Sequence, residues 1–134
     1  MKVIGIIPAR YDSSRFPGKP LANILGKSMI ERVYEQCKKA SSLSDVIVAT
    51  DDERILNHVQ SFGGEAMMTS KDHQSGTDRC NEVVQKLTEN YDVIVNIQGD
   101  EPYINPVQIN EIIELFKEDK TQIGTLAKKI TDIE

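Results

Sequence analysis

The chain has 134 residues, a length typical of one domain, and its 16 lysines and arginines against 21 aspartates and glutamates give a formal net charge of −5. An acidic chain lacks the basic face that nonspecific nucleic-acid binding needs, so no nucleic-acid partner is expected. No apolar run approaches the ~20 residues of a membrane span, and the N-terminus enters a strand-like run without signal-peptide features. These observations predict a cytoplasmic protein with no membrane partner.

Five short apolar runs predict the strands of a sheet that is covered on both faces, because they are continuous rather than alternating and rich in β-branched residues. The predicted strands are Lys2–Ile7, Asp45–Ala49, Glu65–Met68, Val93–Ile97 and Gln122–Ala127. The chain ends at residue 134, soon after the last of them, with no closing helix. We therefore expect residues 1–134 to be one domain, cut from a larger protein.

Amphipathic segments between these strands carry helix-start signals. The signals are a capping box at Ser28 and Glu31, an aspartate cap at Asp51 or Asp52, a hydroxyl cap at Ser75 or Thr77, and the pair Asn105-Pro106. Apolar stripes at helical spacing are Ile30, Val33, Tyr34 and Cys37; then Val83, Val84 and Leu87; then Ile109, Ile112, Ile113 and Phe116. Gly63 or Gly64 is expected to end the second helix. Cys37 and Cys80 form no metal or disulfide pattern and are expected to be free thiols.

Alternating strands and helices predict an α/β fold, Rossmann-like, with a mostly parallel sheet and flanking helices. Ligands of such sheets bind beyond the carboxyl ends of the strands. The unusual residues of the chain follow the predicted strands at those ends: Pro8–Lys19, Thr50–Asp52, Thr69–Thr77 and Gln98–Pro102.

The loop after the first strand predicts a polyphosphate site. It holds the cations Arg10, Arg15 and Lys19, and Pro17 and Pro20 restrict its conformations. Arginine binds phosphate through two parallel hydrogen bonds and lysine acts as a compact point charge, and each charge-assisted bond contributes about 1.5–3 kcal/mol. The alternative is a solvated basic loop, which the position directly after the first strand disfavours.

Two common phosphate motifs are excluded. Gly26-Lys27-Ser28 ends like a P-loop, but Leu21 occupies the position of its first glycine. No G-x-G-x-x-G follows the first strand, which argues against a dinucleotide site. The loop therefore indicates a nucleotide-using enzyme of another kind.

Two further segments are candidates for ligand contact. In Gln98–Pro102, Gly99 allows the backbone to approach a ligand, and Asp100 suits Mg²⁺, which prefers one or two protein carboxylates plus phosphate oxygens; the alternative is a turn with capping duties. In Asp72–Arg79, the hydroxyls, Gly76 and a helix N-terminus could bind a base or ribose. On local evidence an ordinary N-cap is favoured there, and neither His58 nor His73 is expected to be catalytic.

In combination, these motifs resemble the N-terminal half of the 3-deoxy-manno-octulosonate cytidylyltransferase family (CMP-Kdo synthetases). The matching pieces run in family order along the chain: Ile7–Tyr11 with Ser13, Arg15 and Pro17–Leu21; Val48–Asp51; Met68-Thr69 with Asp72–Thr77; and Val93–Asn96 with Gln98–Pro102. Each piece is weak alone, but the set is specific. The similar sialic-acid cytidylyltransferases usually have Lys-Asn in place of Lys19-Pro20 and lack the His-Gln-Ser-Gly-Thr run.

The resemblance implies a nucleotide-diphosphosugar transferase (GT-A-like) fold. It also implies the reaction of CTP with 3-deoxy-D-manno-octulosonate (Kdo) to CMP-Kdo and pyrophosphate, for lipopolysaccharide biosynthesis, with magnesium and a homodimeric full-length enzyme. The implied catalytic residues are Arg10, Lys19 and Asp100, with Asp100 on the metal and Gln98 at the sugar acid. The implied nucleotide-binding residues are Pro8, Ala9, Arg10, Ser13, Arg15, Lys19, Ser75, Gly76, Thr77 and Arg79. The resemblance further implies that residues 1–134 are the nucleotide-binding domain from the N-terminal part of a longer enzyme, so the fragment alone is expected to be poorly active.

Two alternatives stay open. One is another nucleotidyltransferase, acting on sialic acid or a sugar 1-phosphate. The other is a non-catalytic nucleotide-binding module, which Lys19 and Asp100 disfavour because such a module needs no metal carboxylate beside its phosphate loop.

Overall fold

The computed structural model describes residues 2–11, 17–73, 75–99 and 101–118. Four parallel strands form the main sheet in the order β5-β4-β1-β6. They are β1 (Val3–Ala9), β4 (Asp45–Thr50), β5 (Ala66–Met68) and β6 (Val93–Asn96). The predicted α/β class with a parallel sheet is confirmed, and the predicted strand Gln122–Ala127 lies outside the described residues.

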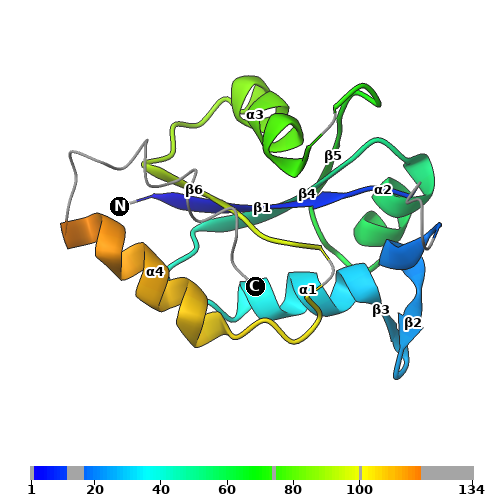
Figure 1. Cartoon of the computed structure of the whole chain (residues 1–134), viewed down its shortest axis with the longest axis horizontal. Helices are drawn as coiled ribbons and strands as arrows, with labels where there is room; N and C mark the ends of the chain where they lie inside the picture. The colour runs from blue at the N-terminus through cyan, green and yellow to red at the C-terminus, as the bar shows by residue number, and fades with distance from the viewer. Residues whose placement is uncertain (1, 12–16, 74, 100, 119–134) are drawn as a thin grey trace.

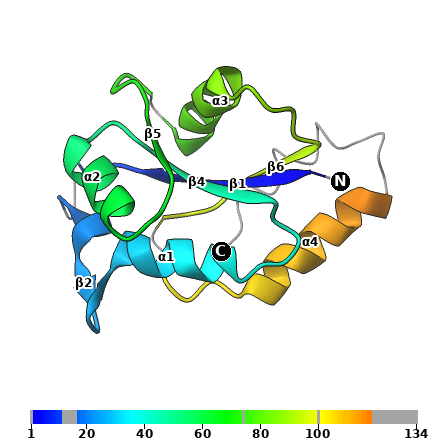
Figure 2. The ribbon, with the colours of Figure 1, turned by 180° about the vertical axis from the view of Figure 1, so that it is seen from behind.

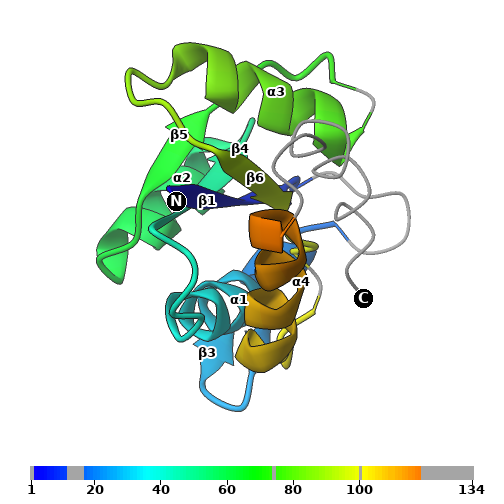
Figure 3. The same ribbon diagram turned by 90° about the vertical axis from the view of Figure 1, so that its left-hand side faces the viewer.

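Helices cover both faces of this sheet. The helices are α1 (Met29–Lys38), α2 (Glu53–Ser61), α3 (Gly76–Lys86) and α4 (Pro106–Glu118). Helix α3 lies on one face, and α1 and α4 lie side by side on the other (Figures 1 and 3). Helix α2 lies at the β5 end of the sheet, as the view from behind shows (Figure 2), and its buried residues join the core on the α1 side.

Strand β1 is a continuous apolar run because it is buried on both faces of the sheet. Its side chains alternate between the two cores: Val3 and Ile7 pack with α1, α2 and α4, whereas Ile4 and Ile6 pack with α3. All four are at most 1% exposed. A central parallel strand has no solvent face, so every position along it is apolar.

The helix caps follow the predicted chemistry. Each cap side chain accepts a hydrogen bond from a backbone N–H of the first turn: Ser28 from Glu31, Asp52 from Arg54, Ser75 from Asp78 and Asn105 from Val107. The cap of α2 is therefore Asp52 and not Asp51, and α3 begins from Ser75 and not Thr77. Helix α2 ends at Ser61, two residues before Gly63, which adopts the left-handed φ of 85°.

Two small elements were not predicted. A short 3₁₀ helix, η1 (Lys19–Leu21), follows the basic loop, and a hairpin of β2 (Asn23–Ile24) and β3 (Lys27–Ser28) leads into α1. Leu25 and Gly26 both have positive φ at the hairpin turn, as tight hairpin turns require. The Gly26-Lys27-Ser28 sequence thus belongs to a hairpin, in agreement with the exclusion of a P-loop.

Strand β1 also runs two residues further than predicted, through Pro8 to Ala9. Proline has no backbone N–H, so it fits poorly between two paired strands. The pairing of β1 with β6 ends at Ile6 and Asn96, whereas the pairing with β4 continues to Ala9. Pro8 therefore lies where β1 has a single paired neighbour.

The two cysteines are buried free thiols, as predicted. Burial raises the pKa of both Cys37 and Cys80 to about 12, so neither is a reactive thiolate at neutral pH. Within the described part of the chain, no helix combines the length and apolar character needed to cross a bilayer.

Candidate functional site

A pocket lies at the carboxyl ends of β1 and β6, where the sheet changes its winding direction. From β1 the chain proceeds outward to β4 and β5, and it then returns through α3 to β6 on the opposite side of β1. Open α/β sheets bind ligands at such a switch point. The pocket has a volume of about 240 Å³ and is lined by Pro8, Ala9, Arg10, Lys19, Pro20, Gln98 and Gly99.

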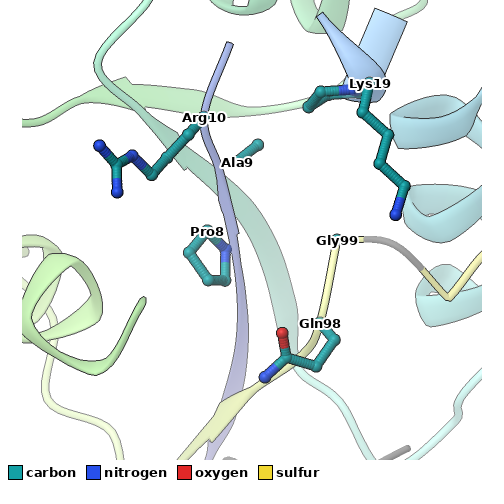
Figure 4. Close-up of a pocket in the computed structure, with 7 residues that line it drawn as sticks. Pro8, Ala9, Arg10, Lys19, Gln98 and Gly99 are labelled. Carbon is teal, nitrogen blue, oxygen red and sulfur yellow. The ribbon is translucent and has the colours of Figure 1, made fainter. Parts of the chain in front are cut away.

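Three separate segments contribute to this lining. The end of β1 supplies Arg10, η1 supplies Lys19, and the segment after β6 supplies Gln98. Figure 4 shows Arg10 and Lys19 on opposite sides of the β1 terminus, with the Lys19 side chain extending toward the level of Gly99. Five of the predicted site residues therefore meet at one pocket, since Pro8 and Ala9 also line it.

Glycines allow two of the walls to approach β1 closely. A Cβ added to Gly99 would lie 2.9 Å from the carbonyl oxygen of Pro8, and one added to Gly76 would lie 3.0 Å from the Pro8 Cγ. Such contacts exclude larger residues unless the backbone shifts. The predicted approach of the Gly99 backbone to a ligand stays a prediction. The N-terminus of α3 is likewise placed against the end of β1.

The serine at the start of α3 has a structural task. The Ser75 hydroxyl accepts a hydrogen bond of 3.1 Å from the Asp78 N–H, which makes it the N-cap. Beneath this N-terminus, Asn96 is 4% exposed and its Oδ1 has no hydrogen-bond partner among the residues that the structure describes. A ligand role for Ser75, Gly76 and Thr77 stays a prediction.

Arg79 is buried under the neighbouring loops. Its side chain is 1% exposed and donates hydrogen bonds to the Thr69 hydroxyl, to the Ser70 carbonyl at 3.1 Å and to the Asp51 carboxylate at 3.4 Å. Arg79 therefore joins the ends of β4 and β5 to α3. Local sequence gave no signal for these contacts, and its predicted role near the nucleotide stays a prediction.

Glu82 of α3 anchors the loop after β5. Its carboxylate accepts a hydrogen bond of 2.9 Å from the Ser70 N–H and contacts the His73 Nε2 at 2.7 Å and the Lys86 ammonium at 2.6 Å. The hydrogen bond from Lys86, followed by those from Ser70 and His73, lowers the pKa of Glu82 to about 2. His73 is thus held against α3. His58, the other histidine, contacts the Ser28 hydroxyl at 2.6 Å.

Three predicted site residues, Ser13, Arg15 and Asp100, lie outside the described residues. Over the ranges that are described, no group of three or more histidine, cysteine, aspartate or glutamate side chains could hold a metal ion. In the sequence, the predicted metal ligand directly follows Gly99, which lines the pocket.

A second hollow, of about 390 Å³, lies at the ends of β4 and β5. It is lined by Asp51, Asp52, Glu53, Arg54, Met68 and Lys71. Three carboxylates in this lining would repel the phosphates of a nucleotide. The described lining of the β1–β6 pocket holds two cations and no carboxylate, so it is the better phosphate site.

Comparisons with known proteins find similarity to cytidylyltransferases. A family profile described as "Cytidylyltransferase" matches residues 4–134. The chain is 63% identical to a 3-deoxy-manno-octulosonate cytidylyltransferase of Parabacteroides distasonis over 128 residues, 96% of this chain and 50% of that protein. It is 57% identical to the protein of that name in Bacteroides thetaiotaomicron over 131 residues, 98% of this chain and 52% of that protein.

A solved structure is also similar. The structure of a CMP:2-keto-3-deoxy-manno-octonic acid synthetase complexed with CTP matches with a TM-score of 0.85 and 48% identity, covering 89% of this chain and 48% of that one. The chain thus spans about half the length of the curated relatives it matches. The family resemblance inferred from the motifs is confirmed.

Proposed function

Because this chain belongs to the cytidylyltransferase family, we propose that it is the nucleotide-binding part of an enzyme that joins CTP and Kdo into CMP-Kdo and pyrophosphate. The observation that carries the proposal is the pocket at the switch point, where Arg10 and Lys19 line the ends of β1 and η1. The names of the relatives support CTP and Kdo as the substrates. The resemblance implies that the product serves lipopolysaccharide biosynthesis.

The triphosphate occupies the cationic side of the pocket in this proposal. A nucleoside triphosphate carries about four negative charges, and charge-assisted hydrogen bonds to lysine and arginine are roughly twice as strong as neutral ones. Lys19 contributes a point charge from η1, and Arg10 contributes two donors in a plane. By the resemblance, Arg15 is assigned to the same triphosphate, and Ser13 is assigned to the nucleotide.

The cytidine lies toward the N-terminus of α3. Pro8 and Ala9 present backbone at the end of β1, and Gly76 brings the helix N-terminus against Pro8. Helix N-termini offer backbone donors and a positive dipole to electron-rich groups. Ser75 and Thr77 are proposed to contact the nucleoside there. Gln98, on the other wall, is assigned to the sugar acid.

Asp100 is proposed to hold Mg²⁺ together with phosphate oxygens. One carboxylate in a pocket with phosphates matches the ligand preference of this ion, which keeps several waters and few protein ligands. Magnesium, when bound, would offset negative charge on the departing pyrophosphate.

In the reaction, the anomeric hydroxyl of Kdo attacks the α-phosphorus of CTP, the bond to the β-phosphate oxygen breaks, and pyrophosphate leaves. Negative charge increases on the leaving oxygens, so Lys19 and Arg10 stabilise the transition state more than the bound substrate. Alignment of the two substrates supplies much of the remaining rate enhancement. The described lining residues include no carboxylate or imidazole, and the proposal therefore names no general base.

The resemblance also implies a homodimer, and the sequence features indicate a cytoplasmic protein; both properties are part of the proposal. Sedimentation of the complete natural protein checks the dimer, and cell fractionation checks the cytoplasmic location. A monomer at micromolar concentration, or recovery with membranes, would contradict them.

The activity itself is tested by pyrophosphate release from the complete natural protein. We expect release to require Kdo, magnesium and CTP, with UTP and GTP at least ten times less effective. Release with sialic acid or a sugar 1-phosphate in place of Kdo would assign the protein to another nucleotidyltransferase. Binding of CTP without release from any of these sugars would identify a non-catalytic module.

A further inference from the structure

Tyr11, the residue after Arg10, is packed between two other segments of the chain. The guanidinium carbon of Arg54, in α2, lies 3.3 Å from the centroid of the Tyr11 ring. On another side, a Cβ added to Gly18 would lie 3.0 Å from the same ring. The Asp52 carboxylate holds Arg54 through two hydrogen bonds, at 3.1 Å to Nε and 2.7 Å to an amino group.

The same tyrosine is bonded to the residue that precedes η1. The Gly18 N–H donates a hydrogen bond of 2.7 Å to the Tyr11 carbonyl. Gly18 has a left-handed φ of 75° and forms the N-cap of η1, in which Lys19 is the first residue. The position of Lys19 at the pocket therefore depends on where Tyr11 holds Gly18.

We propose that Arg54 is a positioning residue for the phosphate site, acting through Tyr11 on Gly18 and Lys19. The set Asp52, Arg54, Tyr11 and Gly18 is called the Tyr11 clamp. This inference rests on the proposed function, since it takes Lys19 to contact the triphosphate. Arg54 itself lines the hollow at the ends of β4 and β5 and is absent from the described lining of the β1–β6 pocket.

Geometry favours a positioning role over simple surface packing. A guanidinium stacked on an aromatic ring is directional, and its planar fork is fixed here by a bidentate carboxylate. The Tyr11 ring leaves no room for a side chain at Gly18, whose φ also favours glycine. Two independent constraints thus act on the residue before Lys19. A displacement of about 1 Å at such a group can cost on the order of 10²-fold in rate.

The chain offers a matched control at the opposite end of the sheet. The Lys2 ammonium lies 5.2 Å from the centroid of the Tyr91 ring and pairs with the Glu89 carboxylate. Lys2 and Arg54 are both exposed cations that, among the described residues, contact a tyrosine ring and pair with a carboxylate. Lys2 is not among the described residues that line the pocket.

The test compares steady-state kinetics of the complete natural protein carrying Arg54→Ala or Lys2→Ala. We expect Arg54→Ala to lower kcat/KM for CTP about two- to fivefold, which corresponds to the 0.5–1 kcal/mol of an exposed cation–π contact. The KM for Kdo should not change, and Lys2→Ala should leave all constants within about twofold. Tyr11→Leu should cost more, about 30-fold, whereas Tyr11→Phe should stay near wild type and Arg54→Lys should restore part of the loss.

A second measurement separates positioning from stability. Both alanine variants are expected to lower the melting temperature by the same few degrees, and amide hydrogen exchange at Gly18 should accelerate in Arg54→Ala alone. Equal kinetics and equal Gly18 exchange in the two variants, with wild-type turnover intact, would overturn the clamp and leave the proposed function standing. A wild-type protein that neither binds nor consumes CTP would overturn the proposed function, and the assignment of the clamp to phosphate positioning with it.

Discussion

The two ends of the parallel sheet are both polar, but their polar groups are arranged differently. At the amino end, residues distant in sequence satisfy one another: the Tyr91 hydroxyl donates to Asp45 at 2.6 Å, Lys2 pairs with Glu89, and the Lys2 N–H donates to Asp92 at 2.7 Å. At the carboxyl end, Arg10 and Lys19 line a pocket of about 240 Å³ together with glycine and proline backbone.

This difference indicates that the polar groups at the amino end stabilise the fold, whereas the pocket at the carboxyl end is the candidate binding site. Charged groups at the amino end are paired across the sheet terminus, and their removal should affect stability only. At the carboxyl end, Arg10 and Lys19 lie at the switch point between β4 and β6 on either side of β1, where they line the pocket. Substitutions in the two regions should therefore separate nucleotide binding from folding.

Lys19→Ala is expected to have the largest effect. Removing this cation should lower turnover of the complete protein by about 10²-fold, the size of the loss of one transition-state donor. The melting temperature should change little, because the Lys19 side chain lies on the surface of the pocket. Steady-state kinetics with CTP compare Lys19→Ala, at the carboxyl end of the sheet, with Lys2→Ala, at the amino end. A rate equal to that of Lys2→Ala would remove Lys19 from the mechanism.

Gly99→Ala tests the close approach at the pocket wall. The new Cβ would lie 2.9 Å from the Pro8 carbonyl oxygen, so the segment after β6 must move. We expect about tenfold weaker CTP binding, in line with an overpacking cost of about 1–3 kcal/mol. The control is Gly5→Ala, whose Cβ meets the flexible end of Ile97. Gly5→Ala should lower the melting temperature without changing the CTP dissociation constant. Weaker CTP binding in Gly5→Ala, with unchanged binding in Gly99→Ala, would contradict the expected difference between the two ends.

Glu82→Gln should change how stability depends on pH. The pKa of Glu82 is lowered in the folded state from 4.5 to about 2, so its contribution is full above pH 4.5 and is lost as the pH falls toward 2. The melting temperature of the variant should be several degrees lower at neutral pH. It should also fall less steeply than that of the wild type as the pH decreases from 4.5 to about 2. Thermal unfolding at a series of pH values measures both, with Glu111→Gln on α4 as an exposed control. Parallel curves of melting temperature against pH for wild type and Glu82→Gln would contradict a lowered pKa of Glu82 in the folded state.

Tyr91→Phe is expected to have the smallest effect. It removes one hydrogen bond to Asp45 at the amino end of the sheet and should reduce the free energy of unfolding by about 1 kcal/mol. Denaturant unfolding measures this loss, and CTP binding should stay unchanged. Weaker CTP binding in Tyr91→Phe would show that the two ends are not independent.

Much of the fold follows from local sequence signals. Continuous β-branched runs predicted β1, β4, β5 and β6 to within two residues at either end, because strands covered on both faces allow apolar residues throughout. The cap residues predicted the starts of the helices. The hairpin β2–β3 and η1 escaped prediction because elements of two or three residues have no hydrophobic period.

The position of the candidate pocket was predictable from the sequence, but the side-chain contacts around it were not. Ligands of open α/β sheets bind beyond the carboxyl ends of the strands, which predicted a site near Pro8, Arg10, Lys19 and Gln98. All four residues line the pocket. The contacts of Arg79 with Asp51 and of Arg54 with Tyr11 join residues 28 and 43 positions apart in the sequence. Such pairs depend on how the loops pack, which no local pattern records.

The most direct measurement of the central claim is a crystal structure of the complete natural protein with CTP and magnesium. The account predicts phosphate oxygens within hydrogen-bonding distance of the Lys19 ammonium and the Arg10 guanidinium, in the pocket between β1 and β6. Phosphates bound elsewhere, for example in the hollow beside Asp51 and Lys71, with Lys19 and Arg10 facing solvent, would contradict it.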